Sequence, residues 1–278
     1  MLFFCEGFRD MEKKISVLMG VYNCADTLEQ AVRSIQNQTY TNWELILCED
    51  GSLDNTYEIA KQLKDGDDRI ILLRNEKNIG LNATLNRCLA VASGEYIARM
   101  DGDDICMPDR FAKQISLLEE EPKYAITSTP MILFDENGEW GQTALPEYPT
   151  PEQVVSGTAI CHAPVMLRRD AMVKVGGYSE NPATLRVEDV NLWIDLYAAG
   201  YRCHNIMTPL YCMRNDQNAL NRRKFVYRIN SVKVRVNGCK KLGLGTKSYV
   251  KAIKPLLIGL IPGRIRRFIR VQLRKKRI

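Results

Sequence analysis

Short apolar runs alternate with amphipathic segments through the first 120 residues of the chain. Four runs are rich in β-branched and aliphatic residues and are short enough to be buried strands: 15–21, 43–49, 69–73 and 95–100. The segments that follow them have apolar residues at helical spacing and predict helices over 28–37, 54–63, 80–92 and 108–119. Strands that alternate with helices are typical of a mainly parallel sheet covered by helices on both faces, so we expect an α/β fold.

The pattern changes after residue 124. Two apolar segments are followed by a predicted helix, a predicted strand and a polar predicted helix: 124–134, 163–168, 188–199, 202–207 and 217–241. No internal repeat or low-complexity segment separates these elements from the first half. We therefore interpret them as the second half of one domain.

We expect three parts in the chain: an N-terminal extension at 1–13, one α/β domain at 14–240 and a tail at 241–278. A chain of 278 residues is long enough to bury a substantial core. The extension is expected because Met11 directly precedes the first organised segment. No run of about 18 apolar residues occurs, so the sequence predicts no helix that spans a membrane.

The net charge of +6 is unevenly distributed. Residues 247–278 hold eleven Lys or Arg and no acidic residue, whereas the rest of the chain holds 28 basic and 33 acidic residues. A mildly acidic body gives no reason to expect nucleic-acid binding. The nine cysteines are odd in number and form no C-x-x-C pair, which argues against a disulfide framework and a zinc knuckle. Reduced thiols indicate a cytosolic protein.

Three carboxylates gather in Asp101-Gly102-Asp103-Asp104, directly after the fourth predicted strand. Neighbouring carboxylates raise one another's pKa, and a divalent cation relieves this repulsion. Oxygen ligands suit Mg²⁺ or Mn²⁺. Asp and Gly are also common in plain turns. The position beyond the carboxyl end of a strand, where ligands bind in such sheets, favours the metal site.

Three weaker candidates lie elsewhere. Glu49-Asp50 at the end of the second predicted strand is either a strand–helix junction or an acceptor for a nucleobase N–H. Glu188-Asp189 is either the first turn of a helix, where acidic residues are favoured, or contains a general base. His162 is either a loop residue or a contact to a ligand or an acceptor.

Several enzyme classes lack their motifs. The first predicted strand is followed by Gly20-Val21-Tyr22-Asn23 and not by G-x-G-x-x-G, which argues against a Rossmann dehydrogenase. The chain also contains no P-loop and no G-x-S-x-G elbow of a hydrolase.

Seven segments in order resemble family 2 of the inverting glycosyltransferases, over about 200 residues from Ile15 to Arg214. They are SVLMGVYN, SIQNQTYTNWELILCEDGSLDNT, NIGLNATLN, GEYIARMDGDD with MPDRF, HAPVMLRRD, VGGY and EDVNLWIDLYAAG. The resemblance implies a GT-A-type fold and a nucleotide-diphosphate sugar donor, commonly a UDP-sugar. It also implies transfer to an acceptor hydroxyl with inverted configuration, and it suggests a pathway of surface polysaccharide or glycolipid assembly.

The resemblance implies a nucleotide site at the ends of the first two predicted strands. Gly20, Val21 and Tyr22 match the loop beside the nucleoside, and Asp50 matches the carboxylate that binds the uracil ring. Glu49 stands where the family often has another Asp, a departure that keeps the charge.

The resemblance also assigns the acidic clusters. Asp101 and Asp103 match the D-x-D motif, with Asp103 as the direct ligand of Mn²⁺ or Mg²⁺ and Asp101 as a contact to the ribose or the metal shell. Asp189 matches the catalytic base, with Glu188 beside it. His162 falls in a segment that lines the donor–acceptor pocket of relatives.

Two other functions stay open at this point. A sugar-nucleotide nucleotidyltransferase has a related sheet, but it needs a Gly-rich basic loop, and residues 21–26 contain no Gly, Lys or Arg. A non-catalytic, membrane-associated protein of the same fold is the other alternative. Loss of Asp103 or Asp189 would indicate it, and both residues are present.

The basic segment 247–278 predicts two short amphipathic helices broken at Pro262-Gly263. Apolar residues fall on one face at helical spacing with arginines around them: Ile265, Phe268, Ile269 and Leu273. Basic amphipathic helices often lie on anionic membrane surfaces, although such a helix can also pack on its own domain. Relatives often use lipid-linked saccharide acceptors, so we expect a peripheral protein on the cytoplasmic face of a membrane.

Overall fold

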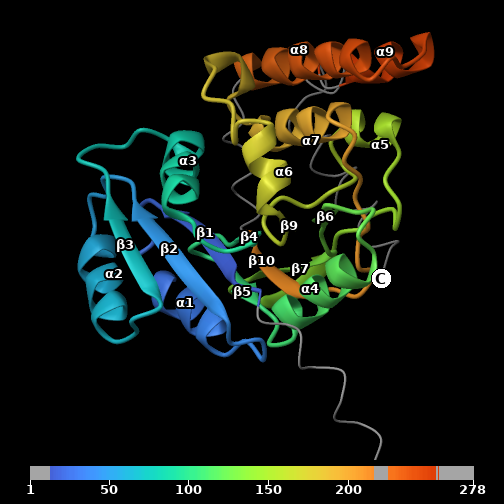
Figure 1. Cartoon of the computed structure of the whole chain (residues 1–278). Coiled ribbons are helices and arrows are strands. Elements are labelled where there is room, and N and C mark those ends of the chain that lie inside the picture. The colour runs from blue at the N-terminus through green and yellow to red at the C-terminus, as the bar shows by residue number, and fades with distance from the viewer. Residues whose placement is uncertain (1–12, 216–224, 255, 257–278) are drawn as a thin grey trace, which may run out of the picture.

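A six-stranded sheet forms the centre of the molecule, for which a computed structural model describes residues 13–215, 225–254 and 256 (Figure 1). The strand order is β3-β2-β1-β4-β9-β6. The bounds are β1 Ile15–Val21, β2 Trp43–Glu49, β3 Ile70–Arg74, β4 Tyr96–Arg99, β6 Ile126–Thr127 and β9 Met166–Arg168. β1 to β4 are parallel, whereas β9 runs antiparallel to both β4 and β6.

Helices cover both faces of this sheet, as Figure 1 shows. α1 (Leu28–Gln36) and α2 (Thr56–Asp65) contact each other, and α3 (Leu81–Val91) packs against β1 and β2. Successive residues of β1 enter different cores, since Val17 joins the cluster that includes α1 and Leu18 the cluster that includes α3. Strands buried on both faces need apolar side chains on both sides, which explains the nearly continuous apolar runs of the sequence.

A second, smaller sheet has the strand order β5-β10-β7-β8. Its strands are β5 Ile105–Cys106, β7 Met131–Asp135, β8 Gly138–Gln142 and β10 Tyr211–Arg214. β5 comes directly after the acidic turn that follows β4, and helix α4 (Arg110–Glu120) comes next. β10 pairs antiparallel with β5, so Arg214 at the end of β10 lies beside the acidic turn.

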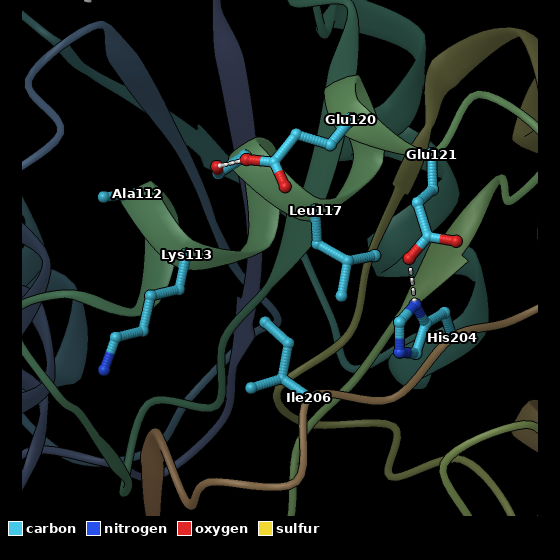
Figure 2. Close-up of a pocket in the computed structure, with 8 residues that line it drawn as sticks. Ala112, Lys113, Leu117, Glu120, Glu121, His204 and Ile206 are labelled. Carbon is cyan, nitrogen blue, oxygen red and sulfur yellow. Dashed lines mark hydrogen bonds and ion pairs between the residues drawn. The ribbon is translucent and has the colours of Figure 1, made fainter. Parts of the chain in front are cut away.

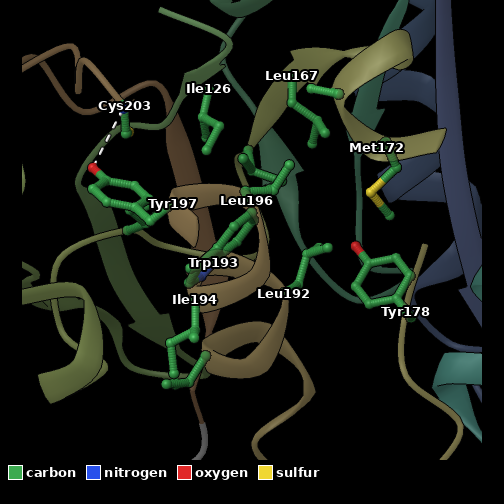
Figure 3. Packing of buried hydrophobic residues seen from close by; sticks show 14 of the residues in the cluster. Ile126, Leu167, Met172, Tyr178, Leu192, Trp193, Ile194, Leu196, Tyr197 and Cys203 are labelled. Atoms are coloured by element: carbon green, nitrogen blue, oxygen red, sulfur yellow. Dashed lines mark hydrogen bonds between the residues drawn. The ribbon is translucent and has the colours of Figure 1, made fainter. Parts of the chain in front are cut away.

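Helix α7 (Glu188–Ala198) is the most deeply buried helix of the second half and follows α5 Pro151–Ser156, α6 Arg169–Lys174 and the short η1 Pro182–Thr184. Its Leu192, Trp193 and Leu196 are almost fully buried and belong to one apolar cluster (Figure 3). Close-packed side chains resist displacement. The first turn of α7, with Glu188 and Asp189, is therefore held in place by the packing of the turns that follow.

Two further helices form an outer layer over this half (Figure 1). α8 (Phe225–Lys241) packs on α7, η1 and α5, and α9 (Thr246–Ala252) packs on α8 and α5. Within the described ranges, no helix has the length and apolar character needed to cross a membrane.

The expected α/β fold, with a mainly parallel sheet between helices, is confirmed. The strand predicted near 202–207 is wrong, because only Cys203 forms an isolated bridge, to Ile126. The next three backbone N–H groups bond to two segments in turn, His204 and Ile206 to Ile126 and Ser128 on one side and Asn205 to Glu147 on the other, but no continuous strand forms beyond the single bridge.

Two predicted segments lie mostly outside the described residues. These are the N-terminal extension 1–13 and the second of the two amphipathic helices expected in 247–278, the one after Pro262-Gly263. The boundaries at 14–240 and 241–278 stay a prediction, with α9 as the described helix of the tail.

Candidate active site

The predicted site residues lie along one edge of the central sheet, where parallel strands end. Gly20 and Val21 end β1 with Tyr22 after them, Asp50 follows β2, and Asp101 and Asp103 follow β4. The second half contributes three more: His162 from the loop before β9, and Glu188 and Asp189 from the first turn of α7. Open α/β sheets bind ligands at this edge.

Asp50 anchors the loop before α3. Its Oδ1 accepts hydrogen bonds from Asn75 Nδ2 (2.7 Å) and the Ile79 backbone N–H (2.9 Å), and its Oδ2 accepts from the Gly80 N–H (3.0 Å). The loop passes so close that a Cβ on Gly51 would lie 2.6 Å from the backbone carbon of Lys77. Asp50 therefore organises this loop, a role that the sequence did not predict. Its Oδ2 still has a lone pair for a ligand.

The acidic turn is packed against the end of β1. A Cβ on Gly102 would lie 2.6 Å from Val21 Cγ1, so only glycine permits this approach. Thr27 Oγ1 donates a hydrogen bond to the Gly102 carbonyl oxygen (2.9 Å). Tyr22 comes next in the chain with a side chain that is 42% exposed. The predicted nucleoside loop and the predicted metal motif are thus in direct contact.

The three carboxylates of this turn converge, with oxygen atoms of Asp101, Asp103 and Asp104 all within 4.8 Å of one another. Loss of solvation, followed by the charge of Asp101, raises the pKa of Asp103 and Asp104, and that of Asp104 lies well above its usual value. Asp104 Oδ1 accepts from the Arg214 N–H (2.7 Å), while its buried Oδ2 has no partner in the described part of the chain. Converging hard oxygens, one of them unsatisfied, fit Mg²⁺ or Mn²⁺.

Arg99 is the residue that sequence reasoning missed. It is buried at the end of β4, and its two terminal nitrogens hold both oxygens of Asp101, one of them at 2.8 Å. Its Nε is buried and has no partner among the described residues. The sequence did contain a signal, since an arginine in an otherwise apolar buried strand requires a charged partner. The carboxylate cluster two residues later supplies it.

Glu188 and Asp189 occupy the first turn of α7. Burial raises the pKa of both carboxyls, and Asp189 raises that of Glu188 further. Asp189 Oδ1 accepts from the Val190 N–H at 2.8 Å, and the positive charges of Arg99 and Arg235 partly offset the effect of burial on its pKa. A carboxylate with a raised pKa is suited to accept a proton from a hydroxyl.

His162 lies beside the base rather than at the acidic turn. Its Nε2 shares a hydrogen bond with the Tyr178 hydroxyl (2.8 Å), and its ring meets Trp193 of α7 edge to face. Burial, with Arg99 as the second cause, lowers the pKa of His162 well below its usual value. The imidazole is therefore neutral near pH 7. Tyr178, from the VGGY segment, was not singled out by the sequence.

Arg99 links the two halves of the site. It pairs with Asp101, and its charge also acts on Asp189 and His162. The structure therefore brings together the D-x-D carboxylates, the candidate base and the histidine around the buried guanidinium of Arg99. Asp50 instead bonds to the loop before α3, on the β2 side of the edge.

A separate pocket lies between α4 and the segment around His204 (Figure 2). Its lining includes Lys113, Leu117 and Ile206, and His204 Nδ1 lies 2.9 Å from a carboxylate oxygen of Glu121. None of the predicted site residues lines this pocket, so it is distinct from the carboxylate edge.

Two curated proteins illustrate the relatives of this chain. The putative glycosyltransferase EpsE of Bacillus subtilis (strain 168) is 42% identical over 91% of both chains. The Escherichia coli protein WfaP, a UDP-Glc:alpha-D-GlcNAc-diphosphoundecaprenol beta-1,3-glucosyltransferase, is 27% identical over 78% of this chain and 84% of its own.

A solved structure supports the same fold. S. aureus TarS 1-349 in complex with UDP-GlcNAc superposes with a TM-score of 0.65, at 15% identity, over 91% of this chain and 82% of its own. This likeness agrees with the expected GT-A-type fold. The model of Glycosyl transferase family 2 matches residues 16–176, more than half of the chain. With the match to EpsE over nearly the whole length, we conclude that this chain belongs to glycosyl transferase family 2.

Proposed function

We propose that this protein transfers a sugar from a UDP-sugar to an acceptor hydroxyl, with inversion at the anomeric carbon, in surface polysaccharide or glycolipid assembly. The UDP-GlcNAc complex of TarS and the UDP-Glc named as donor of WfaP support a uridine nucleotide. The diphosphoundecaprenol in the name of WfaP supports a lipid-linked saccharide as acceptor.

The observation that carries the proposal is the arrangement of carboxylates around Arg99. Asp101 and Asp103 lie on the side of β1 and its nucleoside loop, and Asp189 lies on the side of α7. A transferase needs both parts: one that holds the diphosphate and one that takes a proton from the attacking hydroxyl. A protein that only binds nucleotides has no need of the second.

The donor side would bind the nucleotide and the metal. Tyr22 and Asp50 would contact the uracil, with the second lone pair of Asp50 Oδ2 accepting its N–H. Asp103 would hold Mn²⁺ or Mg²⁺, with Asp101 beside it. When bound, the ion offsets negative charge on the departing diphosphate.

The acceptor side would carry the proton transfer. Asp189 takes the proton of the acceptor hydroxyl while that oxygen forms a bond to the anomeric carbon. The bond from this carbon to the diphosphate oxygen breaks on the opposite side, so UDP leaves and the configuration inverts. Glu188 adds negative charge beside Asp189, and neutral His162 with Tyr178 lines the pocket between the two parts.

UDP binding, measured by calorimetry with and without Mn²⁺, tests the donor site. We expect metal-dependent binding that Asp103→Asn abolishes. Asp68→Asn is the matched control, because Asp68 is exposed and lies just before β3, at the opposite edge of the sheet. Binding of GDP or CDP instead of UDP would contradict the uridine donor. No binding of any nucleotide would contradict the activity itself.

We also propose that the protein acts at the cytoplasmic face of a membrane, as a peripheral protein held by the tail 241–278. The support is the excess of basic residues in 247–278 and the lipid-linked acceptor named for WfaP. Deletion of 247–278 should move the protein to the soluble fraction of a lysate. Equal partitioning of the truncated and full-length proteins would contradict this location.

A further inference from the structure

The outer layer formed by α8 and α9 has one buried side and one exposed side. Asn230, Val234 and Gly238 of α8 and Ala252 of α9 are buried beneath the layer. Both helices pack on α5, so their exposed sides face away from it, at the outside of the molecule (Figure 1). We call this exposed side the α8–α9 face.

The two helices of the α8–α9 face contribute positive charge only, while Asp195 of α7 pairs with Lys241 and Glu152 of α5 lies near Lys251. Between 225 and 254 the sequence contains no Asp or Glu. Eight basic residues occur in this range: Arg228, Lys233, Arg235, Lys240, Lys241, Lys247, Lys251 and Lys254. All six lysines are exposed. Lys247 and Lys251 of α9 and Lys254 just after it are spaced by four and three residues, so they share a helix face with Val250.

The same face also exposes large apolar side chains. Val226 and Ile229 of α8 are exposed and share one helix face with Lys233, since they are spaced by three and four residues. Phe225, next to Val226 in the chain, is also exposed. Val250 of α9 is 72% exposed, and Ile253 just after α9 is also exposed. Isolated exposed apolar residues are ordinary, but several on one face with an excess of basic residues are typical of a surface that meets anionic lipid.

The buried side of α8 reaches the candidate base. Arg235 of α8 lies close enough to Asp189 for each charge to shift the pKa of the other. Its guanidinium also packs at Gly157, where a Cβ would lie 2.8 Å from an Arg235 terminal nitrogen. One helix therefore carries the α8–α9 face on its outside and borders the acceptor side of the site on its inside.

We propose that the α8–α9 face docks on an anionic membrane surface, with Val250 and Ile253 at the headgroup boundary and the lysines over the lipid phosphates. A lipid-linked acceptor held in that membrane would then be presented on the side of Asp189. This docking deepens the membrane location proposed above, since α9 lies in the tail 241–278, and the orientation rests in addition on the proposed lipid-linked acceptor. No segment of this face needs to cross the bilayer.

The test is co-sedimentation of the full-length protein with phosphatidylcholine vesicles, with and without phosphatidylglycerol, at low and high salt. Wild-type protein should bind only the anionic vesicles, and less at high salt. Each lysine near the surface contributes about fivefold, so Lys247→Ser with Lys251→Ser and Lys254→Ser should weaken binding roughly a hundredfold. Val250→Ser with Ile253→Ser should weaken it about tenfold.

Exposed apolar residues elsewhere provide the matched controls. Val173→Ser on α6 and Val91→Ser on α3 remove similar exposed surface and should leave vesicle binding unchanged. If the variants of the α8–α9 face sediment like wild type, the proposal is overturned, and the basic segment 257–278 alone accounts for the binding. Binding that is equal on neutral vesicles would overturn it as well. UDP calorimetry on the same variants keeps the outcomes separate, since intact UDP binding with lost vesicle binding leaves the donor site unaffected.

Discussion

Gly102 permits the contact between the acidic turn and β1, and Gly102→Ala tests that contact. The added Cβ would lie 2.6 Å from Val21 Cγ1 and 3.4 Å from Cys24 Sγ. Val21 is 1% exposed and ends a strand that is paired with β2 and β4 on its two sides, so its side chain has little room to move. Gly102 is not among the glycines with a left-handed backbone, so steric overlap is the main cost of the substitution.

The magnitude follows from packing. Overfilling a well-packed site costs about 1–3 kcal/mol. In a chain of this size each kcal/mol lowers the melting temperature by roughly 2–4 °C, so we expect a decrease of roughly 2–12 °C. The turn can relax only by moving Asp101 and Asp103 away from β1. We therefore expect Mn²⁺-dependent UDP binding to weaken about tenfold, which corresponds to about 1.4 kcal/mol.

Thermal unfolding and UDP calorimetry on a double-mutant cycle provide the assay. Val21→Ala removes Cγ1, so the double variant should be more stable than the sum of the single changes by about 0.5–3 kcal/mol. Gly66→Ala is the control, because its Cβ would meet only Gln62 O at 3.6 Å and Leu63 O at 3.7 Å, both ordinary contacts. If Gly102→Ala melts and binds UDP like Gly66→Ala, or if Val21→Ala gives no rescue, the steric reasoning is wrong.

Three further predictions concern the same edge of the sheet. Arg99→Met removes a charge that lowers the pKa of Asp189, so the acidic limb of the pH–rate profile for sugar transfer should move to higher pH. If this limb does not move, Arg99 does not influence the ionisation of Asp189. Gly51→Ala should destabilise the protein by about 2–4 kcal/mol in thermal unfolding, because Gly51 has φ +69° and its Cβ would meet immovable Lys77 backbone; wild-type stability would refute this. Burial, followed by the nearby carboxylates, raises the pKa of Cys24 to about 11, so iodoacetamide should label it slowly at pH 8, as peptide mapping can show. Rapid labelling at that pH would contradict the burial.

The first half of the fold was predictable because its strands are covered on both faces. Apolar runs such as 15–21 and 43–49 have no solvent side, and the strands formed with those bounds. The second half was less predictable, since its chain bonds to several neighbours in turn. The segment 202–207 forms only the bridge from Cys203 to Ile126, and its next N–H groups bond to two distant segments, which sequence patterns do not encode.

The candidate site shows the same division. Carboxylates such as Asp103 and Asp189 stand out locally, at a strand end and at a helix start. The pairing of Arg99 with Asp101 and the bond of His162 to Tyr178 depend on how distant elements pack, so their roles became visible only in three dimensions. Asp50 combines both cases: its position at a strand end can be read from the sequence, whereas its hydrogen bonds to the loop before α3 cannot.

The buried Arg99 at the end of β4 also allows the protein to fold without a bound metal ion. A cluster of three carboxylates on its own would repel itself in the metal-free protein. Arg99 is a permanent internal counter-ion that neutralises part of that charge through Asp101, whether or not an ion has arrived. The metal-free protein can therefore fold in the presence of a chelator, with the carboxylates at the edge of the sheet already in position. With the metal dependence proposed above, metal and donor would govern when the enzyme is active and would have little part in whether it is folded.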